Sequence, residues 1–402
     1  MKILSVNVGS TSLKYQLLTG NWLGSASDIS FQFSGSVERI GDPTSYFHHT
    51  NYVDGKPVSI EGKLSAPSHL EAIEHCVSLM PDFGQIDGIG FKTVFAKDIW
   101  QSAIIDQSVI QALEAYIPLA PLHNRAYLAA IRSFQKILPK IPLVAVMETW
   151  FHQSIPDYAY EFGIPRYWLE KHQIRRYGFH GASHRWVSER APQVLKRSAT
   201  NLRIVSCHLG GSSSVTAIKN GQSIDTSMGV STQCGVVQST RVGDLDPFAV
   251  LYVMEKESWS PAEVTRQLME ESGLKGISSF ASDMRDLNSA AENGNDQARL
   301  AIETYCYGVK KYIGAYVAAL GGIDVLAFTG GIGEKSANTR FLICSGLEYM
   351  GIKLDLDKND QNLSETSIST NHSQVQILTI PANEEFVVAR ETARLIQGNL
   401  GN

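Results

Sequence analysis

Short apolar segments of strand length alternate along this chain with longer segments of helical periodicity. The strand-like segments are Ile3–Val8, Ile141–Val146, Leu202–His208 and Val325–Phe328. The segments with helical spacing between them are Ser108–Tyr116, Ala126–Ile137 and Asp296–Leu320. Strands that alternate with helices are typical of an α/β protein, so we predict that fold class.

Two stretches far apart in the chain share one pattern, "SVNVGSTSLKY" near the start and "SCHLGGSSSVTA" from Ser206. Each reads as a strand, a turn of glycine and hydroxyl residues, and a second strand. Asn7 precedes Gly9 by two residues, as His208 precedes Gly210. Backbone N–H groups of such turns can surround phosphate oxygens, and Lys14 would add charge. The pattern indicates two related halves with phosphate-binding turns, against the alternative of two ordinary Gly/Ser turns.

A third glycine-rich turn, "FTGGIGEKS", follows the predicted strand Val325–Phe328. Its glycines would let the backbone approach a ligand closely, and a helix is expected to follow. A strand, glycine-rich turn and helix are common in any α/β protein. As a third such turn in one chain, however, the segment favours a nucleotide ligand.

Composition excludes several classes of protein. The chain has 402 residues, is 43% hydrophobic and 19% charged, and carries a formal net charge of −5. This charge argues against a nucleic-acid-binding surface. No window reads as a membrane span or a signal peptide, so we expect no membrane partner and a cytoplasmic location. Five scattered cysteines without a C-x-x-C pair indicate free thiols rather than a disulfide framework or a metal cluster.

Seven segments together resemble the acetate kinase family, in the family's order and across about residues 1 to 396. They are the Asn7–Lys14 turn, "RRYGFHGASHRWVSERA" (175–191), "DTSMG" (225–229), "STRVGDLDP" (239–247), "SSFASDMRD" (278–286), "FTGGIGEKS" and "IPANEE" (380–385). RRYGFHG-x-SH and TR-x-GD-x-DP are the most specific of them.

The resemblance implies an α/β fold of two similar actin-like (ribonuclease H-like) domains that flank a nucleotide cleft. The N-terminal domain would comprise residues 1–149 and 386–402. The second domain, residues 150–385, would carry most of the nucleotide site. The resemblance also implies a homodimer.

The activity implied by the resemblance is reversible, direct in-line transfer of a phosphoryl group from ATP to a short-chain carboxylate, acetate or propionate, which gives an acyl phosphate. Such a reaction depends on positioning and on stabilising negative charge. The implied catalytic residues are Lys92, Glu148, His180 and Arg241. Magnesium would be bound near Asn7 and Glu384, because Mg²⁺ prefers oxygen ligands.

The same resemblance implies the binding residues. Nucleotide would contact Lys14, His208, Gly210, Gly211, Ser212, Asp283, Met284, Arg285, Gly331, Ile332, Gly333, Glu334 and Lys335. The carboxylate would contact Lys92, Val94, Leu122, His123, Phe179 and Thr232. Without the family pattern, Arg241 would read as a surface ion-pair residue, His180 as a core histidine and Glu384 as an exposed carboxylate.

The sequence departs from the family near the expected chemistry. Lys92 stands where the family has an arginine, and lysine lacks the planar, two-pronged donor geometry that suits carboxylate and phosphoryl oxygens. Glu148 replaces an aspartate. Further departures are Gly211-Ser212 for Asn-Gly, Thr232 for proline, and Lys335 for asparagine. Arg125, which stands where the family has proline, either replaces the lost guanidinium or points to solvent.

These departures leave open two alternatives to an ATP-dependent acyl kinase. Changes at Gly211, Ser212 and Lys335 are compatible with another phosphate donor, such as pyrophosphate. Changes at Lys92 and Glu148 are compatible with a catalytically weak relative that binds nucleotide as a sensor or as a partner for another protein.

Overall fold

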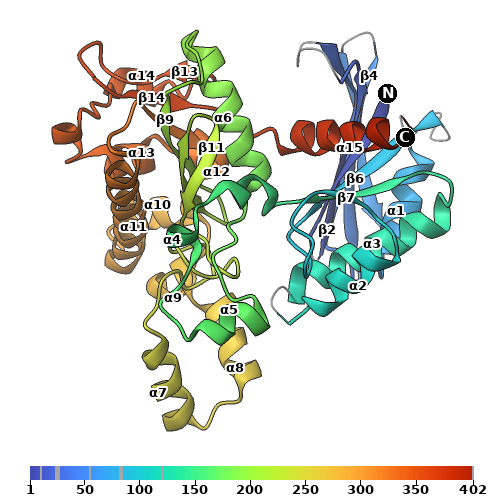
Figure 1. Cartoon of the computed structure of the whole chain (residues 1–402), viewed down its shortest axis with the longest axis horizontal. Coiled ribbons are helices and arrows are strands. Elements are labelled where there is room, and N and C mark those ends of the chain that lie inside the picture. The colour runs from blue at the N-terminus through green and yellow to red at the C-terminus, as the bar shows by residue number, and fades with distance from the viewer. Residues whose placement is uncertain (10, 23–27, 54–55, 81–84, 119–120, 401–402) are drawn as a thin grey trace. The chain divides into compact units, whose positions relative to one another are not determined.

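The computed structural model describes residues 1–9, 11–22, 28–53, 56–80, 85–118 and 121–400 (Figure 1). By their internal packing these residues divide into two compact units. Unit 1 comprises residues 1–150 and 383–402, and unit 2 comprises residues 151–382. Each unit is a mixed β-sheet with helices.

Unit 1 begins with a series of antiparallel strands and continues with helices that alternate with strands. Its elements are β1 (Lys2–Val8), β2 (Ser12–Gly20), β3 (Ile29–Glu38), β4 (Ser45–Val53), β5 (Lys56–Leu64), α1 (His69–Ser78), β6 (Gly88–Thr93), β7 (Ala103–Ile104), α2 (Gln107–Ala115), α3 (Pro121–Ile137), β8 (Leu143–Met147) and α15 (Glu384–Leu400). A 3₁₀ helix, η3 (Trp150–Ser154), follows β8 at the boundary between the units.

Unit 2 repeats the strand–helix alternation and adds a longer run of helices. Its elements are α4 (Asp157–Tyr160), α5 (Arg166–His172), α6 (Gly181–Leu195), β9 (Arg203–His208), β10 (Ser214–Lys219), β11 (Gln222–Thr226), α7 (Pro247–Glu257), α8 (Pro261–Arg266), the π-helix η4 (Gln267–Glu271), α9 (Gly273–Ser278), α10 (Met284–Glu292), α11 (Asp296–Leu320), β12 (Val325–Thr329), α12 (Gly330–Lys335), α13 (Ala337–Cys344), η5 (Glu348–Met350), α14 (Leu356–Asp360), β13 (Thr366–Ser367) and β14 (Gln376–Thr379).

The two sheets share one strand order. In unit 2 the order is β11-β10-β9-β12-β14-β13, and in unit 1 it is β5-β4-β3-β2-β1-β6-β8-β7. Removal of β4 and β5 leaves the same sequence of neighbours. The pairing directions also agree, because β1–β2 and β9–β10 are antiparallel whereas β1–β6 and β9–β12 are parallel. The predicted α/β fold with two similar halves is therefore confirmed.

Helices cover opposite faces of the sheet in unit 1. Adjacent residues of a strand point to opposite faces. Phe91 of β6 packs edge-on against Phe134 of α3, with ring centroids 5.6 Å apart. Its neighbour Gly90 faces α15, where an added Cβ would lie 2.1 Å from Thr392 Oγ1. The absence of a side chain at Gly90 therefore lets α15 lie close to β6.

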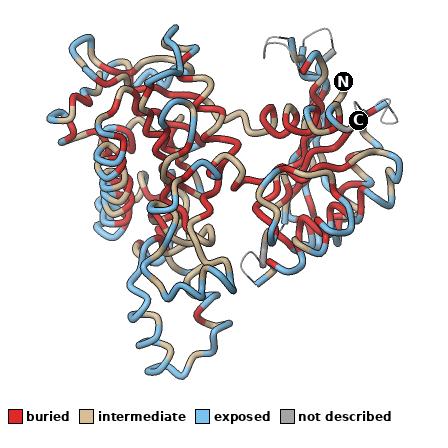
Figure 2. Tube along the Cα trace, viewed as in Figure 1, coloured by how far each residue is buried: buried red, intermediate tan, exposed pale blue. Residues whose placement is uncertain are grey.

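The sheet of unit 2 is covered in the same way. Ser206 of β9 faces α6, since its hydroxyl oxygen lies 2.9 Å from Nδ1 of His184 on that helix. The next residue, Cys207, belongs to the hydrophobic cluster built around α11. Figure 2 shows the buried trace running along the central strands and the inner helix surfaces of each unit. α7 contributes no fully buried residue.

Predicted elements agree with the observed ones except at their ends. The helix Asp296–Leu320 has the predicted bounds. The helix predicted from Ala126 begins at Pro121 instead, because proline suits the first turn, where its missing N–H has no partner to lose. The strand predicted from Ile141 begins at Leu143, after Pro142. All five cysteines are free, as predicted.

The tight contact between β6 and α15 predicts that Gly90→Ala destabilises the protein. A methyl group at this position would overlap Thr392 Oγ1 and would lie 3.0 Å from Val388 Cγ1. Overpacking of this kind costs about 1–3 kcal/mol. We expect a lower midpoint of urea unfolding for the variant.

Gly163→Ala is the matched control, because an added Cβ there has no neighbour within 4 Å. This variant should unfold at the parent's midpoint. A Gly90→Ala protein as stable as the Gly163→Ala protein would show that α15 is not held against β6 as described.

Candidate active site

The β9–β10 turn is joined by backbone hydrogen bonds to the end of β12. Leu209 N donates to the Thr329 carbonyl at 2.8 Å, and the Leu209 carbonyl accepts from Ile332 N at 2.8 Å and from Gly333 N at 3.2 Å. Parallel pairing of β9 with β12 places these strand ends side by side. The predicted nucleotide residues at 208–212 and 331–333 are therefore brought together.

The segment predicted as a third glycine-rich turn is helical. Residues 330–335 form α12, so the prediction of a loop at 331–335 was wrong. Gly330 opens this helix with φ +76°, and an added Cβ would lie 2.7 Å from the Leu209 carbonyl oxygen. A left-handed backbone and this close approach both require glycine. Gly331 is exposed, whereas Gly333 is buried.

Arg241 contacts the β9–β10 turn directly. Its Nη1 donates to Ser212 Oγ at 2.9 Å and to Gln238 Oε1 at 3.3 Å. Gln238, which is fully buried, also accepts from the Ser212 hydroxyl at 2.8 Å and donates through Nε2 to the Thr232 carbonyl at 2.8 Å. One buried amide therefore connects a predicted catalytic residue, a predicted phosphate-binding residue and a predicted substrate-binding residue.

Gly210 and Gly211, the two glycines of this turn, are not required by the local packing. An added Cβ at Gly210 would lie 3.4 Å from the Ser212 carbonyl oxygen, and one at Gly211 would lie 3.5 Å from Ser239 Oγ. Neither glycine has a left-handed backbone. Their small size keeps side chains away from the backbone of the turn, which suits the approach of an anion, although Gly210 N itself donates to Ser213 Oγ at 3.1 Å.

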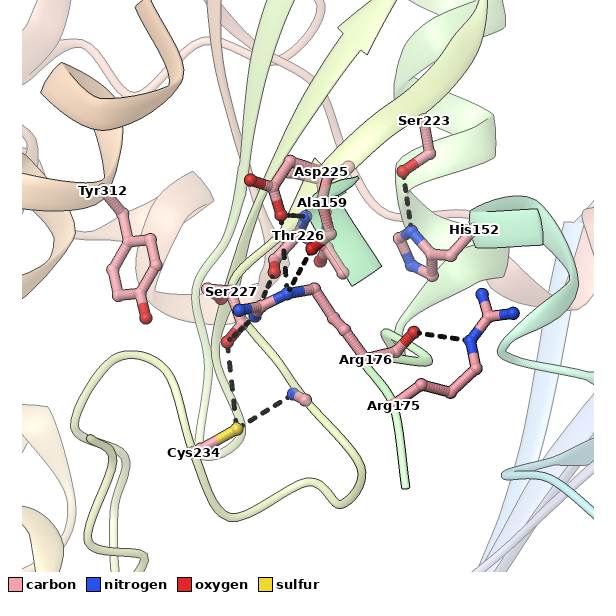
Figure 3. A network of polar contacts seen from close by, with 12 residues as sticks. His152, Ala159, Arg175, Arg176, Ser223, Asp225, Thr226, Ser227, Cys234 and Tyr312 are labelled. Carbon is pink, nitrogen blue, oxygen red and sulfur yellow. Dashed lines mark hydrogen bonds and ion pairs between the residues drawn. The ribbon is translucent and has the colours of Figure 1, made fainter. Parts of the chain in front are cut away.

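Arg176, from the "RRYGFHG" motif, binds backbone carbonyls at the start of the segment that leads to Arg241 (Figure 3). Its Nη1 donates to the carbonyls of Thr226 at 2.8 Å and Ser227 at 3.3 Å, and its Nε lies 3.6 Å from Asp225 Oδ1. Cys234 Sγ accepts from Gly229 N at 2.9 Å. Hydrogen bonds therefore hold the segment from β11 to Arg241 in place at its start and near its middle.

Four histidines and several serines form a buried cluster behind the turn. His180 stacks on His208, with ring centroids 4.2 Å apart and an angle of 27° between the planes. His208 Nδ1 lies 2.8 Å from Ser183 Oγ, and His180 Nδ1 lies 2.9 Å from Ser214 Oγ. His180 has a left-handed backbone, with φ +56°, immediately before α6. An uncommon conformation at this position directs its ring into the cluster.

The other two histidines of the cluster are neutral. Burial lowers the pKa of His152 to about 4, although its bond to the Phe179 carbonyl acts in the opposite direction. Burial lowers the pKa of His184 well below its usual value, and the nearby His152 and His208 lower it further. His152 Nε2 donates to the Phe179 carbonyl at 3.0 Å, so its Nδ1 accepts from the Ser223 hydroxyl at 2.9 Å.

Unit 1 holds a compact charged group at the carboxyl ends of β6 and β8. Lys92 Nζ donates to Glu384 Oε2 at 2.7 Å and lies 3.9 Å from Glu148 Oε2. Burial alone would lower the pKa of Lys92, but attraction first to Glu384 and then to Glu148 outweighs it and raises the pKa above its usual value. The ammonium is therefore charged and shared between two carboxylates.

The remaining predicted residues of unit 1 lie around this charged group and along β1 and β2. Asn7 and Lys14 are opposite each other on β1 and β2. Val94 is buried just after β6, and His123 is partly buried on α3. Arg125 is exposed on α3, and the side chain of Leu122 lies outside the described residues.

The predicted adenosine residues surround α10 and α12 in unit 2. Asp283 caps α10 and pairs with Arg285, which lowers the pKa of Asp283. Met284 is buried in the hydrophobic core, so only its backbone could meet a ligand. Glu334 and Lys335 line a cavity of about 400 Å³ together with Asn362 and Ser364. Phe179 is buried and Thr232 is partly buried.

A metal ion is expected from the reaction class, and the structure offers oxygen ligands rather than a preformed cage. Among the described residues, no group of three or more His, Cys, Asp or Glu side chains is arranged to hold a metal. Glu384, one of the two predicted metal residues, nevertheless presents a carboxylate beside Lys92. Such donors fit a hard cation that keeps several waters and phosphate ligands.

Several residues that build the site had no sequence signal of their own. Ser183 and Ser214 lie within segments that the sequence marks and Gln238 lies directly before one, but none of the three was itself predicted as a site residue, and only their burial identifies them. His184 had a signal, because it follows His180 by four residues and so lies on the same face of α6.

No helix in the described part of the chain is both long and apolar enough to cross a membrane.

The buried, neutral His152 predicts a loss of stability in acid. Unfolded histidine binds a proton near pH 6.5, whereas folded His152 does so only near pH 4. Its contribution is complete above pH 6.5 and is lost as the pH falls toward 4, by about 1.4 kcal/mol per pH unit. For His152→Gln, we expect the free energy of unfolding, measured in urea between pH 7 and 5, to depend less steeply on pH.

His372→Gln is the control, because His372 lies exposed in a turn. This variant should keep the parent's dependence on pH. Equal slopes for the parent and His152→Gln would show that His152 is not held neutral by burial.

Sequence comparison matches the chain to known proteins over nearly its whole length. The profile of the Acetokinase family matches residues 2–390. The acetate kinase of Dictyoglomus thermophilum is 43% identical over 405 residues, which cover 98% of this chain and 99% of that protein. The acetate kinase of Caldanaerobacter subterraneus subsp. tengcongensis is 43% identical over 408 residues, with 99% and 100% covered.

Solved structures agree with the sequence matches. The Porphyromonas gingivalis acetate kinase has a TM-score of 0.86 at 37% identity, and the matched residues cover 98% of this chain and 99% of that one. A propionate kinase from Francisella tularensis subsp. tularensis has a TM-score of 0.89 at 36% identity with the same coverage. These matches confirm the resemblance read from the motifs, and the chain belongs to the acetokinase family.

Proposed function

We propose that this protein catalyses the reversible, ATP-dependent phosphorylation of a short-chain carboxylate, acetate or propionate, to an acyl phosphate. The observation that carries the proposal is the contact of the Arg241 guanidinium with Ser212, at 2.9 Å in the β9–β10 turn. A cation, a turn with two glycines and the His180–His208 pair lie together, which suits a phosphoryl group that develops negative charge. The printed names of the relatives agree with acetate or propionate as the acceptor.

The residues of unit 2 would bind the nucleotide and stabilise the transferred group. The β9–β10 turn and the first residues of α12 would hold the phosphates, and Asp283, Arg285 and the cavity beside Lys335 would receive the adenosine. Arg241 and His180 would donate hydrogen bonds to the phosphoryl oxygens. Because these donors are placed before the substrate binds, little reorganisation is needed during the reaction.

The residues of unit 1 would serve the carboxylate and the metal. Lys92 would supply the positive charge toward the acceptor oxygens, and its contacts with Glu148 and Glu384 would hold it in place. Val94 and His123 would border the acyl group. Mg²⁺ bound through Glu384 and Asn7 would neutralise phosphate charge when the nucleotide is present. Lysine here gives a point charge in place of a two-pronged guanidinium contact.

A coupled assay with ATP or pyrophosphate, Mg²⁺ and a panel of short acids tests this function. We expect turnover with ATP and with acetate or propionate. Arg241→Ala should lower kcat by about a hundredfold or more while the ATP affinity changes little, because the guanidinium contact strengthens in the transition state. The affinity for ATP is measured separately by calorimetry.

Arg299→Ala is the control, since Arg299 pairs with Asp296 on the exposed side of α11. It should keep the parent's kinetics. Turnover with pyrophosphate but not ATP would support the second donor, and ATP binding without turnover on any acid would support a nucleotide-binding role. Parent-like kcat in Arg241→Ala would contradict the role of Arg241.

We also propose that the two units are the two domains of the enzyme and that the protein is a homodimer in the cytoplasm. The exposed side of α7 supports a dimer, because Phe248, Leu251 and Tyr252 are 75%, 58% and 61% exposed there. A cluster of large apolar side chains on a surface commonly marks an interface. Five free thiols and the need for ATP support the cytoplasm.

Leu251→Glu tests the dimer. A carboxylate at this position would be desolvated without a partner in an apolar interface, so the variant should run at the mass of one chain in light scattering while the parent runs at two. Glu255→Gln on the same helix should remain a dimer. A monomeric parent, or a dimeric Leu251→Glu protein, would contradict an interface at α7.

A further inference from the structure

Four side chains in unit 2 form an unbroken hydrogen-bonded chain that ends at His180. Ser206 Oγ lies 2.9 Å from His184 Nδ1, and His184 Nε2 lies 2.7 Å from Ser214 Oγ. Ser214 Oγ in turn lies 2.9 Å from His180 Nδ1. β9 supplies Ser206 and β10 supplies Ser214, while His184 lies on α6. Each member touches the next, so the positions of their protons are coupled.

His184 carries only one ring proton in this chain. The residue is fully buried, and burial together with His152 and His208 lowers its pKa well below 6.5. A neutral imidazole donates from one nitrogen and accepts at the other. Two arrangements of protons are therefore possible, one with the hydrogen of His184 on Nδ1 and one with it on Nε2.

Ser206 decides between the two arrangements. Its side chain is fully buried, and in the described part of the chain, which includes all of unit 2, the one partner found for its hydroxyl is His184. A hydroxyl that accepted from His184 Nδ1 would leave its own hydrogen buried without an acceptor, which costs about 1–3 kcal/mol. Ser206 therefore donates to His184 Nδ1, and the hydrogen of His184 lies on Nε2.

The same reasoning continues to His180. His184 Nε2 donates to Ser214 Oγ, so the hydroxyl hydrogen of Ser214 is directed to the remaining neighbour, His180 Nδ1. Nδ1 of His180 is then an acceptor, and neutral His180 carries its hydrogen on Nε2. His208 stacks on the ring at 4.2 Å and limits its rotation.

We propose that Ser214, whose hydroxyl is oriented by Ser206 and His184, is a positioning residue that holds His180 as the neutral Nε2–H tautomer. This tautomer donates a hydrogen bond to the transferred phosphoryl group. This inference rests on the proposed function. A proton added at His180 Nδ1 would have to donate to Ser214, which would force Ser214 to donate back to His184 and reverse the chain. Reversal would leave the Ser206 hydroxyl hydrogen without an acceptor. The chain therefore favours His180 as a neutral donor over His180 as an imidazolium or a general base.

The experiment combines histidine ¹⁵N NMR with kinetics on the full-length protein. In the parent at pH 7, His180 should show an acceptor-type Nδ1 and a donor-type Nε2, with assignment by His180→Gln. In Ser214→Ala, His180 should lose this single tautomer. With acetate and ATP, kcat should fall roughly tenfold or more while KM for ATP stays within about twofold.

Ser206→Ala is the second variant and Thr216→Val the control. Ser206→Ala removes the donor that orders the chain, so it should disturb the His180 signals although it touches neither His180 nor Ser214. Thr216 lies on β10, and its buried hydroxyl bonds to Thr226 Oγ1 at 2.8 Å, outside the chain. Thr216→Val should leave both the His180 signals and kcat unchanged.

The outcomes separate this inference from the proposed function. A parent spectrum with hydrogen on His180 Nδ1, or a parent-like spectrum in Ser214→Ala, would overturn the proton arrangement. A changed spectrum with parent kcat would overturn the positioning role. If the parent phosphorylates no acid, the proposed function fails, whereas the spectra still decide which tautomer the chain selects.

Discussion

The arrangement of the candidate site in unit 2 depends on the backbone N–H and carbonyl of one residue, Leu209. Its N–H closes the parallel pairing of β9 with β12, and its carbonyl receives the first N–H groups of α12. Two chain segments more than a hundred residues apart in sequence are thereby held in contact. Gly330 permits this contact because any larger residue would meet the Leu209 carbonyl. The two backbone segments that a phosphate would approach are held by backbone hydrogen bonds, which do not depend on side-chain rotamers.

Several buried polar groups around this junction make short, specific contacts. Gln238 joins Ser212, Thr232 and Arg241, and Arg176 ties the end of β11 through two carbonyl groups. Each such bond contributes little net stability, but an unmatched partner would be costly in a dry interior. Networks of this kind therefore restrict the site to one geometry, which is what phosphoryl transfer requires of its donors.

Charge in unit 1 follows a different principle. Lys92 on β6 contacts two carboxylates, Glu148 just after β8 and Glu384 at the start of α15, and the cost of burying three charges is offset only while all remain together. Lysine at this position supplies the same charge as an arginine would but not the planar guanidinium geometry. The structure shows how the lysine is accommodated, because a compact ammonium fits between Glu148 and Glu384.

Sequence alone determined the class of fold, the two related hairpins and the family. Apolar periodicity and turn residues are local properties, and β1–β2 and β9–β10 are hairpins whose partners adjoin in sequence. Helix and strand ends were displaced, and residues 330–335 were read as a loop. At these residues the long-range contact with Leu209 determines the backbone conformation. A local sequence pattern contains no information about that contact.

The family motifs marked His180 and Arg241 in the sequence, but not what surrounds them. Ser214, Gln238 and Ser206 are common residue types that no motif marks individually, and their importance arises from burial beside a polar partner that lies elsewhere in the chain. A buried hydroxyl must place its single hydrogen on a particular acceptor, whereas an exposed one can use water. Only the tertiary structure decides which serine is buried and what it faces, and so only the structure decides where the protons of the site lie.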